Sequence, residues 1–193
     1  MNVLSLFDGM SCGQIALNKL GIKYDNYFAS EIDKYAIQVT QKNYPNTKQI
    51  GSVLDVKGED LPNIDLLIGG SPCQGFSIAG NKLNFDDDRS KLFFEFVRLK
   101  NELNPKYFLL ENVKMKDEIA NAIDELMGVK RVFIDSRDFT GHIRKRYYWT
   151  NLPIEEIKSK EIKISDIIDD KPFDKNMDFF LNRTPYAPTE SYD

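Results

Sequence analysis

The sequence is poor in the residues that bind metals or form disulfides, with two cysteines and one histidine in 193 residues. Cys12 and Cys73 alone cannot supply the disulfide framework that stabilises small secreted domains, and no paired Cys/His spacing predicts a zinc site. We therefore predict no metal centre and a protein of a reducing compartment, the cytoplasm.

Long apolar runs are also absent, since no stretch approaches the roughly 20 residues that a membrane-spanning helix requires. The first residues, "MNVLSLFDGMSCG", carry no basic segment before their short apolar run and reach Asp8 early, which argues against a signal peptide. A hydrophobic fraction of 41% and a charged fraction of 29% are typical of a globular protein. The length predicts one domain with a core of its own.

An overall excess of positive charge is missing as well. The net charge of -4 at pH 7 argues against a protein that binds nucleic acid through general electrostatic attraction. One stretch, "HIRKRYYW", still predicts a local basic face, because Arg144 and Arg146 alternate on an expected strand and share one side of it. These arginines could protect a solvated sheet edge or bind a phosphate or a base carbonyl.

Strands and helices are expected to alternate along the first three quarters of the chain. Strands are predicted over residues 2–7, 26–30, 48–53, 64–70, 106–113, 130–139 and 144–152. Helices are predicted over residues 11–21, 33–44, 89–103 and 116–128. This order predicts an α/β fold with a mostly parallel sheet, helices on both faces and an antiparallel pair at the end. The pattern weakens beyond residue 153, so we assign 1–153 to the domain and 154–193 to a C-terminal extension.

The residues with chemical potential directly follow the expected strands. They occur in the segments "FDGMSCG", "SEID", "GSV", "GGSPCQG" and "LLENV". Parallel sheets bind ligands at this edge, where the carboxyl ends of the strands meet. Cys73 lies between a proline and a glutamine in a Gly/Ser-rich turn, which suits an accessible thiolate better than a buried apolar side chain. The sequence therefore predicts one composite site.

Several of these residues have an ordinary structural explanation. The glycines of "FDGMSCG" could admit a ligand to the backbone or could form a tight turn with Ser11 as the N-cap of the next helix. Glu31 could bind the hydroxyls of a ribose or cap the following helix. Glu111, at the end of a buried strand, could be a functional acid or a hydrogen-bonded anchor.

The aromatic residues Phe93, Phe94 and Phe96 have helical spacing, and we expect them in the core rather than in a platform for stacking bases.

In this order, the motifs resemble those of the DNA cytosine-5 methyltransferases. "FDGMSCG" resembles the first cofactor motif of that family, "GGSPCQGFS" its catalytic Pro-Cys-Gln motif, "ENV" its Glu-Asn-Val motif and "IRKRYYW" its paired-arginine motif. The resemblance implies a Rossmann-like class I methyltransferase fold. It also implies a role in restriction-modification in a bacterial or phage-infected cell, or a nuclear location in a eukaryote.

The resemblance implies transfer of a methyl group from S-adenosylmethionine to carbon 5 of a cytosine that is flipped out of duplex DNA. Cys73 would attack carbon 6 of the base, because covalent catalysis divides a difficult step into two. Glu111 would act at ring nitrogen 3, with Asn112 beside it. Arg146 would lie near the carbonyl oxygen of the base, with Arg144 as its partner.

The resemblance also implies the cofactor-binding residues, which fall into three groups. Those around the methionine end are Phe7, Asp8, Gly9, Met10 and Gly13. Those around the nucleoside are Glu31 at the ribose, Ile32 at the adenine, and Ser52 with Val53. Pro72 and Leu92 match further contacts. The family usually has an aspartate where this chain has Ser52, which accepts a hydrogen bond without carrying charge.

The chain departs from the family most clearly in its length, because a target-recognition domain and a last cofactor motif are not visible in it. The chain could therefore be a cofactor-binding remnant, or a subunit that is inactive without a second polypeptide. A cytosine methyltransferase acting on tRNA is a further alternative, since such enzymes use similar motifs.

Overall fold

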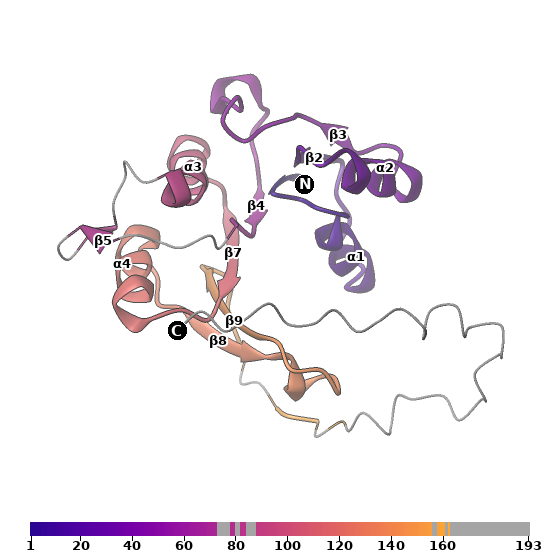
Figure 1. Ribbon diagram of the computed structural model, residues 1–193. Coiled ribbons are helices and arrows are strands. Elements are labelled where there is room, and N and C mark those ends of the chain that lie inside the picture. The colour runs from indigo at the N-terminus through magenta and orange to yellow at the C-terminus, as the bar shows by residue number, and fades with distance from the viewer. Residues whose placement is uncertain (73–77, 80–81, 84–87, 156–157, 161, 163–193) are drawn as a thin grey trace, which may run out of the picture.

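The computed structural model describes residues 1–72, 78–79, 82–83, 88–155, 158–160 and 162 (Figure 1). Its main sheet contains β1 (Asn2–Leu6), β2 (Asn26–Ser30), β3 (Lys48–Gln49), β4 (Leu66–Gly69), β7 (Tyr107–Val113), β8 (Val132–Asp135) and β9 (Lys145–Thr150). The helices are α1 (Cys12–Lys19), α2 (Lys34–Asn43), α3 (Asp88–Leu103) and α4 (Asp117–Met127).

The seven strands follow the order β3-β2-β1-β4-β7-β9-β8. The pairings from β3 to β7 are parallel, whereas β9 runs antiparallel to both of its neighbours. The predicted mostly parallel α/β sheet with an antiparallel last strand is therefore confirmed. The central strand β1 is buried along Val3–Leu6, as expected for a strand covered on both faces.

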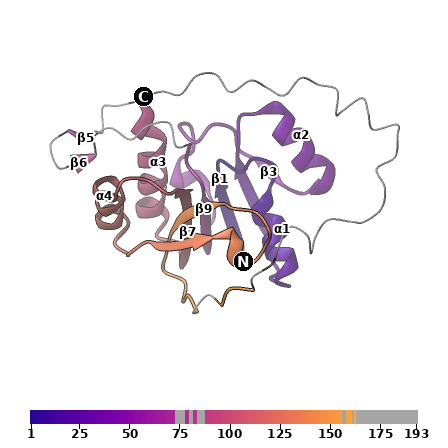
Figure 2. The same cartoon turned by 60° about the horizontal axis from the view of Figure 1, so that its bottom comes forward.

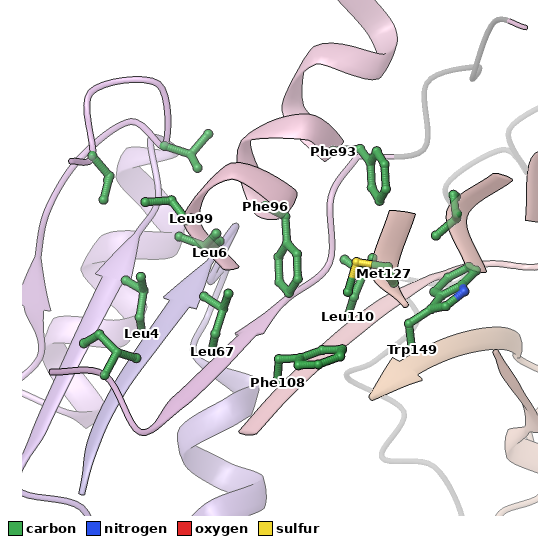
Figure 3. Packing of buried hydrophobic residues seen from close by; sticks show 14 of the residues in the cluster. Leu4, Leu6, Leu67, Phe93, Phe96, Leu99, Phe108, Leu110, Met127 and Trp149 are labelled. Carbon is green, nitrogen blue, oxygen red and sulfur yellow. The ribbon is translucent and has the colours of Figure 1, made fainter. Parts of the chain in front are cut away.

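Helices cover the two faces of the sheet. Alternate residues of β1 point to opposite sides, so that Leu4 and Leu6 join one core cluster while Val3 joins the other. The first cluster contains Phe93 and Phe96 of α3, which confirms that these aromatics belong to the core (Figure 3). Leu17 of α1 packs on the opposite face. Figure 2 shows α3 and α4 together, away from α1 and α2.

A buried carboxylate attaches α4 to the last strand. Asp124, 7% exposed, accepts a hydrogen bond of 2.7 Å from the indole Nε1 of Trp149, which is fully buried. The guanidinium of Arg131 donates to the second oxygen of Asp124 at 2.9 Å. These bonds satisfy polar atoms that would otherwise be costly to bury, and they fix the end of the sheet next to the site.

The structure differs from the sequence-based prediction in three places. The strand predicted over residues 130–139 is β8 only as far as Asp135, because a 3₁₀ turn, Ser136–Asp138, follows it. The third strand was predicted over residues 48–53, but β3 ends at Gln49 because Gly51 has a positive φ of 77° that interrupts an extended chain. The short antiparallel pair β5 (Ile78–Ala79) and β6 (Lys82–Leu83) was not predicted at all. Among the described residues, no helix is long and apolar enough to cross a membrane.

Candidate active site

At one edge of the sheet, three strands end level with one another and with Leu110 of β7. Leu6 of β1 pairs with Ser30 of β2 and with Gly69 of β4, and Gly69 pairs with Leu110 of β7. The residues that follow, Phe7, Glu31, Gly70 and Glu111, therefore lie side by side, with Glu111 still inside β7, which continues to Val113. With neighbouring strands about 4.8 Å apart, the row spans about 14 Å from β2 to β7. The predicted convergence of the motifs at one edge is present in the fold.

The turn between β1 and α1 has an unusual backbone. Phe7, Gly9 and Ser11 all have positive φ values of 57°, 57° and 61°. Such a value is rare for a residue as bulky as phenylalanine, and backbone strain of this kind clusters at ligand sites. Ser11 occupies the N-cap position as predicted, but its hydroxyl makes no capping bond to α1. It donates instead to Asp8 at 2.5 Å.

Three of the predicted cofactor residues in this turn differ in how accessible they are to a ligand. Asp8 is 9% exposed and its carboxylate already accepts bonds from Ser11 and from Tyr27, so this side chain serves the turn itself. Met10, by contrast, is 56% exposed. A side chain at Gly9 would meet no atom within 4 Å, so the backbone there is open to a ligand.

Gly13 has a packing role that the sequence did not indicate. A Cβ atom at this position would lie 2.4 Å from Cδ1 of Ile68 and 2.6 Å from the hydroxyl of Tyr27. Only a glycine therefore lets α1 approach the sheet this closely. This packing accounts for Gly13 without a ligand, and its predicted contact with a cofactor stays a prediction.

Glu31 is held by three backbone amides. Its Oε2 accepts from the Gly9 N–H at 2.7 Å, and its Oε1 accepts from Ile32 and Asp33 at 2.8 and 2.9 Å. An ionised carboxylate has about four acceptor positions, so roughly one remains for a ligand. Asp33, not Glu31, caps α2, because its carboxylate accepts from the amides of Tyr35 and Ala36. The structure therefore excludes the capping explanation for Glu31.

The surroundings of Glu31 include an exposed apolar side chain, Ile32, and the polar loop after β3. Ile32 is 77% exposed and is therefore not a core residue. Ser30 donates to the carbonyl of Gly51 at 2.8 Å, which brings the loop after β3 next to the end of β2. In that loop the hydroxyl of Ser52 accepts from the Leu54 amide at 3.3 Å. Val53 is 4% exposed and belongs to the core, so only its backbone can face a ligand.

A residue that sequence analysis missed fixes this loop. Arg98 on α3 donates to the carbonyls of Val56 and Val53 at 2.8 and 3.5 Å. Its guanidinium also pairs with Glu95 and Glu102 on the same helix. In the sequence, this spacing indicates no more than charges along a solvated helix face. The contact with the loop depends on the tertiary fold and leaves no local signal.

The segment before Cys73 is held by Asn112. The side-chain amide of Asn112, 2% exposed, donates to the carbonyl and the hydroxyl of Ser71 at 3.3 and 3.2 Å. Its own carbonyl oxygen accepts from the Val113 amide. Pro72 follows Ser71 and is exposed, while Cys73 lies outside the described residues. Asn112 thus connects β7 to the segment that leads to the predicted nucleophile.

Glu111 lies next to both arginines of the "IRKRYYW" stretch. The Nε of Arg146 lies 2.6 Å from Oε1 of Glu111, and a terminal nitrogen of Arg144 lies 3.7 Å from the same oxygen. The Nε–H of Arg146 is not directed at that oxygen, so the contact is an ion pair without hydrogen-bond geometry, although the Nε is buried. A Cβ at Gly70 would lie 3.1 Å from Oε2 of Glu111, so a glycine leaves room for this carboxylate.

Leu92, the last of the predicted cofactor residues, and His142, the only histidine of the chain, have ordinary surroundings. Leu92 on α3 is partly buried and packs against the core cluster. His142 is exposed, and its carbonyl accepts a bond from the Ser136 hydroxyl. No group of three metal-binding side chains occurs in the described part of the chain.

Comparison with known proteins supplies an independent finding. A sequence model of the family described as C-5 cytosine-specific DNA methylase matches residues 1–122. The orphan methyltransferase M.SPRI of Bacillus phage SPR is 42% identical over 116 residues, which cover 59% of this chain and 26% of that protein. The type II methyltransferase M1.ScrFI of Lactococcus lactis subsp. cremoris is 39% identical over 147 residues, which cover 71% of this chain and 37% of that protein.

A solved structure agrees with these relatives. The chain is similar to a putative DNA modification methyltransferase encoded within a prophage of E. coli, with a TM-score of 0.64 and 29% identity. That match covers 78% of this chain and 46% of the other. The chain thus spans between about a quarter and two fifths of the length of these two curated relatives.

Proposed function

Because the chain belongs to the C-5 cytosine-specific DNA methylase family, we propose that it transfers a methyl group from S-adenosylmethionine to carbon 5 of cytosine in DNA. One observation carries this proposal beyond family membership. The Glu31 side of the proposed cofactor pocket, the segment leading to Cys73 and the Glu111–Arg146 pair lie side by side at one edge of the sheet. A base and a methyl donor must meet at such an edge.

The residues at the β2 end fit the proposed methyl donor, a nucleoside joined to a methionine. Glu31 offers a carboxylate that retains about one acceptor position for a ribose hydroxyl. The exposed Ile32 offers an apolar surface for an adenine ring. Space is open beside the backbone of Gly9 and of Gly51, both with positive φ, where a side chain would obstruct a ligand. When bound, S-adenosylmethionine supplies an electrophilic methyl group.

Cys73 is proposed as the nucleophile that adds to carbon 6 of the cytosine. A thiolate is the strongest nucleophile among ordinary side chains at neutral pH, which the weakly electrophilic ring requires. After carbon 5 has been methylated, its proton leaves to solvent and the thiolate is eliminated. Asn112 would support this residue indirectly, because it fixes Ser71 two positions earlier in the chain.

Glu111 is proposed to hydrogen-bond ring nitrogen 3 of the base while the cysteine adds. Charge develops on that side of the ring, and a positioned acid there lowers the barrier to addition. Arg146 holds Glu111 through its ion pair, and its remaining N–H groups are proposed to reach the base carbonyl. Arg144, with a side chain 57% exposed, is suited to a phosphate of the DNA backbone.

The length of the relatives bears on the activity of this chain. More than half of the E. coli prophage protein, and more than half of each curated relative described above, has no counterpart here. Reading a DNA sequence requires side chains that reach base edges, each good pair contributing about 1–3 kcal/mol. We therefore propose that sequence-specific methylation needs further polypeptide in addition to these 193 residues.

The proposal is tested with DNA that contains 5-fluorocytosine. The carbon-5 fluorine cannot leave as a proton does, so a working site becomes covalently attached to the DNA. The chain is incubated with cofactor and fluorinated duplex, and adducts are separated on a denaturing gel, with tRNA carrying the same base as a second substrate. We expect a DNA adduct in the wild type that is lost in Cys73→Ser.

Cys12→Ser is the matched control, because Cys12 is an exposed thiol on α1 that the proposal does not use. It should form the adduct at the wild-type yield. An adduct that persists in Cys73→Ser would exclude Cys73 as nucleophile. A yield that is higher with tRNA than with DNA would replace the proposed substrate.

A further inference from the structure

A network of polar side chains, all buried except the half-buried Tyr24, extends from the turn after β1 into the protein. Its members are Asp8, Ser11, Gln14, Tyr24, Tyr27 and Thr47. Gln14 is central to it: 2% exposed, it donates to Ser11 at 2.9 Å and to Thr47 at 2.8 Å. A fully satisfied network of this kind gives the surrounding backbone one defined arrangement. Each side chain in the network makes at least one of these hydrogen bonds.

Tyr27 makes the contact that matters most for the turn. Its ring is 2% exposed and its hydroxyl donates to Oδ1 of Asp8 at 2.8 Å, while Ser11 donates to Oδ2. Burial, together with the nearby Asp8 carboxylate, raises the pKa of Tyr27, which keeps the phenol protonated and able to donate. A buried carboxylate needs such donors, because burying its charge unpaired is costly.

Gly9, the residue that follows Asp8, is fixed through both its N–H and its carbonyl group. The Gly9 N–H donates to Glu31 at 2.7 Å, and the Gly9 carbonyl accepts from Thr40 on α2 at 3.2 Å. The Asp8 amide donates to the Ser30 carbonyl at 3.2 Å, which ties the turn to β2. The orientation of the Glu31 carboxylate therefore depends on the position of Gly9, and that position depends on Asp8.

The close approach of α1 maintains this arrangement. Because Gly13 has no Cβ, the Tyr27 hydroxyl lies where a side chain of α1 would otherwise be, 2.6 Å from the ideal Cβ position. Gly13 and Tyr27 together thus seat the first turn of α1 against Asp8.

We propose that Tyr27 is a positioning residue for cofactor binding, which acts through Asp8 to hold the Phe7–Ser11 turn and, through Gly9, the carboxylate of Glu31. The proposal rests on the proposed function, because it assigns Tyr27 to the same cofactor site. It assigns Asp8 a role within the protein, in contrast to the direct contact with the cofactor that the family resemblance implied.

The first test measures binding of S-adenosylhomocysteine by calorimetry, together with the melting temperature of each variant. Tyr27→Phe removes one donor to a buried carboxylate, and we expect the affinity to fall about tenfold. Tyr107→Phe is the matched control, since this half-buried tyrosine of β7 packs against the same apolar cluster as Tyr27 but shares no described hydrogen bond with the network. Its affinity should stay within twofold of the wild type. Equal affinities for wild type and Tyr27→Phe would overturn the proposal.

A mutant cycle with Asp8→Ala separates positioning from general destabilisation. If Tyr27 acts through Asp8, adding Tyr27→Phe to Asp8→Ala should weaken binding by less than twofold. A further tenfold loss in the double variant would contradict the proposed route through Asp8.

Amide hydrogen exchange at Gly9 makes the test independent of the cofactor. Exchange at this N–H should accelerate at least tenfold in Tyr27→Phe and remain unchanged in Tyr107→Phe. Unchanged exchange at Gly9 would overturn the positioning role, whatever the affinity. If the wild type does not bind S-adenosylhomocysteine, the proposed function fails, while the Gly9 measurement still decides whether Tyr27 holds the turn.

Discussion

The β1–α1 turn and the end of β7 differ in how completely their polar groups are bonded. In the turn, Asp8, Gly9 and Glu31 are held by hydrogen bonds from within the protein. At the end of β7, the buried Nε of Arg146 has no hydrogen bond among the described residues, although it lies next to Glu111.

A buried donor without a hydrogen bond is rare in native proteins and requires an explanation. Here the donor lies 2.6 Å from Glu111 as an ion pair, so the turn is held by directed hydrogen bonds and the end of β7 by opposite charges. The predictions that follow are chosen to separate these two regions.

The largest effect is expected at the end of β7. Glu111→Gln keeps the shape of the side chain but removes its acid function, and the rate of adduct formation with 5-fluorocytosine DNA should fall by about 100-fold or more. Affinity for S-adenosylhomocysteine should stay within twofold, because the cofactor side is built from other strands. The control is Glu118→Gln, an exposed acid on α4. A parallel loss of cofactor affinity in Glu111→Gln would remove the distinction between the two regions.

The opposite pattern is expected on the cofactor side. Glu31→Ala removes a ribose acceptor and leaves three backbone amides unpaired, so affinity for S-adenosylhomocysteine should fall more than tenfold. Asp33→Ala should leave affinity within twofold while destabilising the protein by about 1 kcal/mol, because Asp33 is the N-cap of α2. Calorimetry and urea unfolding measure the two quantities. Equal affinity losses in both variants would mean that Glu31 serves only the local fold.

Because the Tyr27 hydroxyl donates to Asp8, the free energy of unfolding should decrease at alkaline pH. The pKa of Tyr27 is raised in the folded protein, so its contribution to stability is fully present below the unfolded pKa of about 10 and is lost as pH rises above it. At pH 11 the wild type should have lost about 1.4 kcal/mol through this group.

Urea unfolding at pH 8 and pH 11 should therefore show a smaller alkaline loss in Tyr27→Phe than in the wild type. All other side chains are common to both proteins, so their contributions cancel in the comparison. An identical pH dependence in the two proteins would show that Tyr27 is not held as a buried donor.

The smallest effect is expected in the loop after β3. Ser52 accepts from the Leu54 amide, and an aspartate can make the same bond while adding a negative charge near the pocket. Ser52→Asp should strengthen binding of S-adenosylhomocysteine a few-fold if its adenine amine lies there. Ser52→Ala serves as the control and should not strengthen it. Weaker binding in Ser52→Asp than in Ser52→Ala would place the adenine elsewhere.

Local patterns predicted the strands and helices well where each element repeats a clear period. The alternating burial of β7 and the αL glycine that ends α4 both follow from local sequence. The position of the site at the carboxyl edge also followed from the order of the elements. The grouping of Phe7, Glu31, Gly70 and Glu111 at one edge could be predicted because their motifs lie at or near the carboxyl ends of neighbouring strands, while their roles stay predictions.

The contacts that hold the site could not be predicted in the same way. In the sequence, Tyr27 is indistinguishable from any other apolar residue of a buried strand. Its bond to Asp8 depends on the close packing of α1 at Gly13. Ser11 was expected to cap α1, but the Asp8 carboxylate competes for its hydroxyl. Asn112 holds Ser71 across two strands that are far apart in the sequence. Each of these bonds depends on tertiary proximity, which no local pattern encodes.

Transfer of tritiated methyl groups from S-adenosylmethionine to duplex DNA tests the central claim most directly. The purified chain should produce 5-methylcytosine, at a rate far below the roughly 1–1,000 turnovers per second of typical enzymes, and Cys73→Ser should abolish the product. The slow rate is expected because sequence-specific methylation is proposed to need further polypeptide in addition to these 193 residues. Rapid methylation of one defined sequence by the chain alone, or labelled cytosine in Cys73→Ser, would contradict the account.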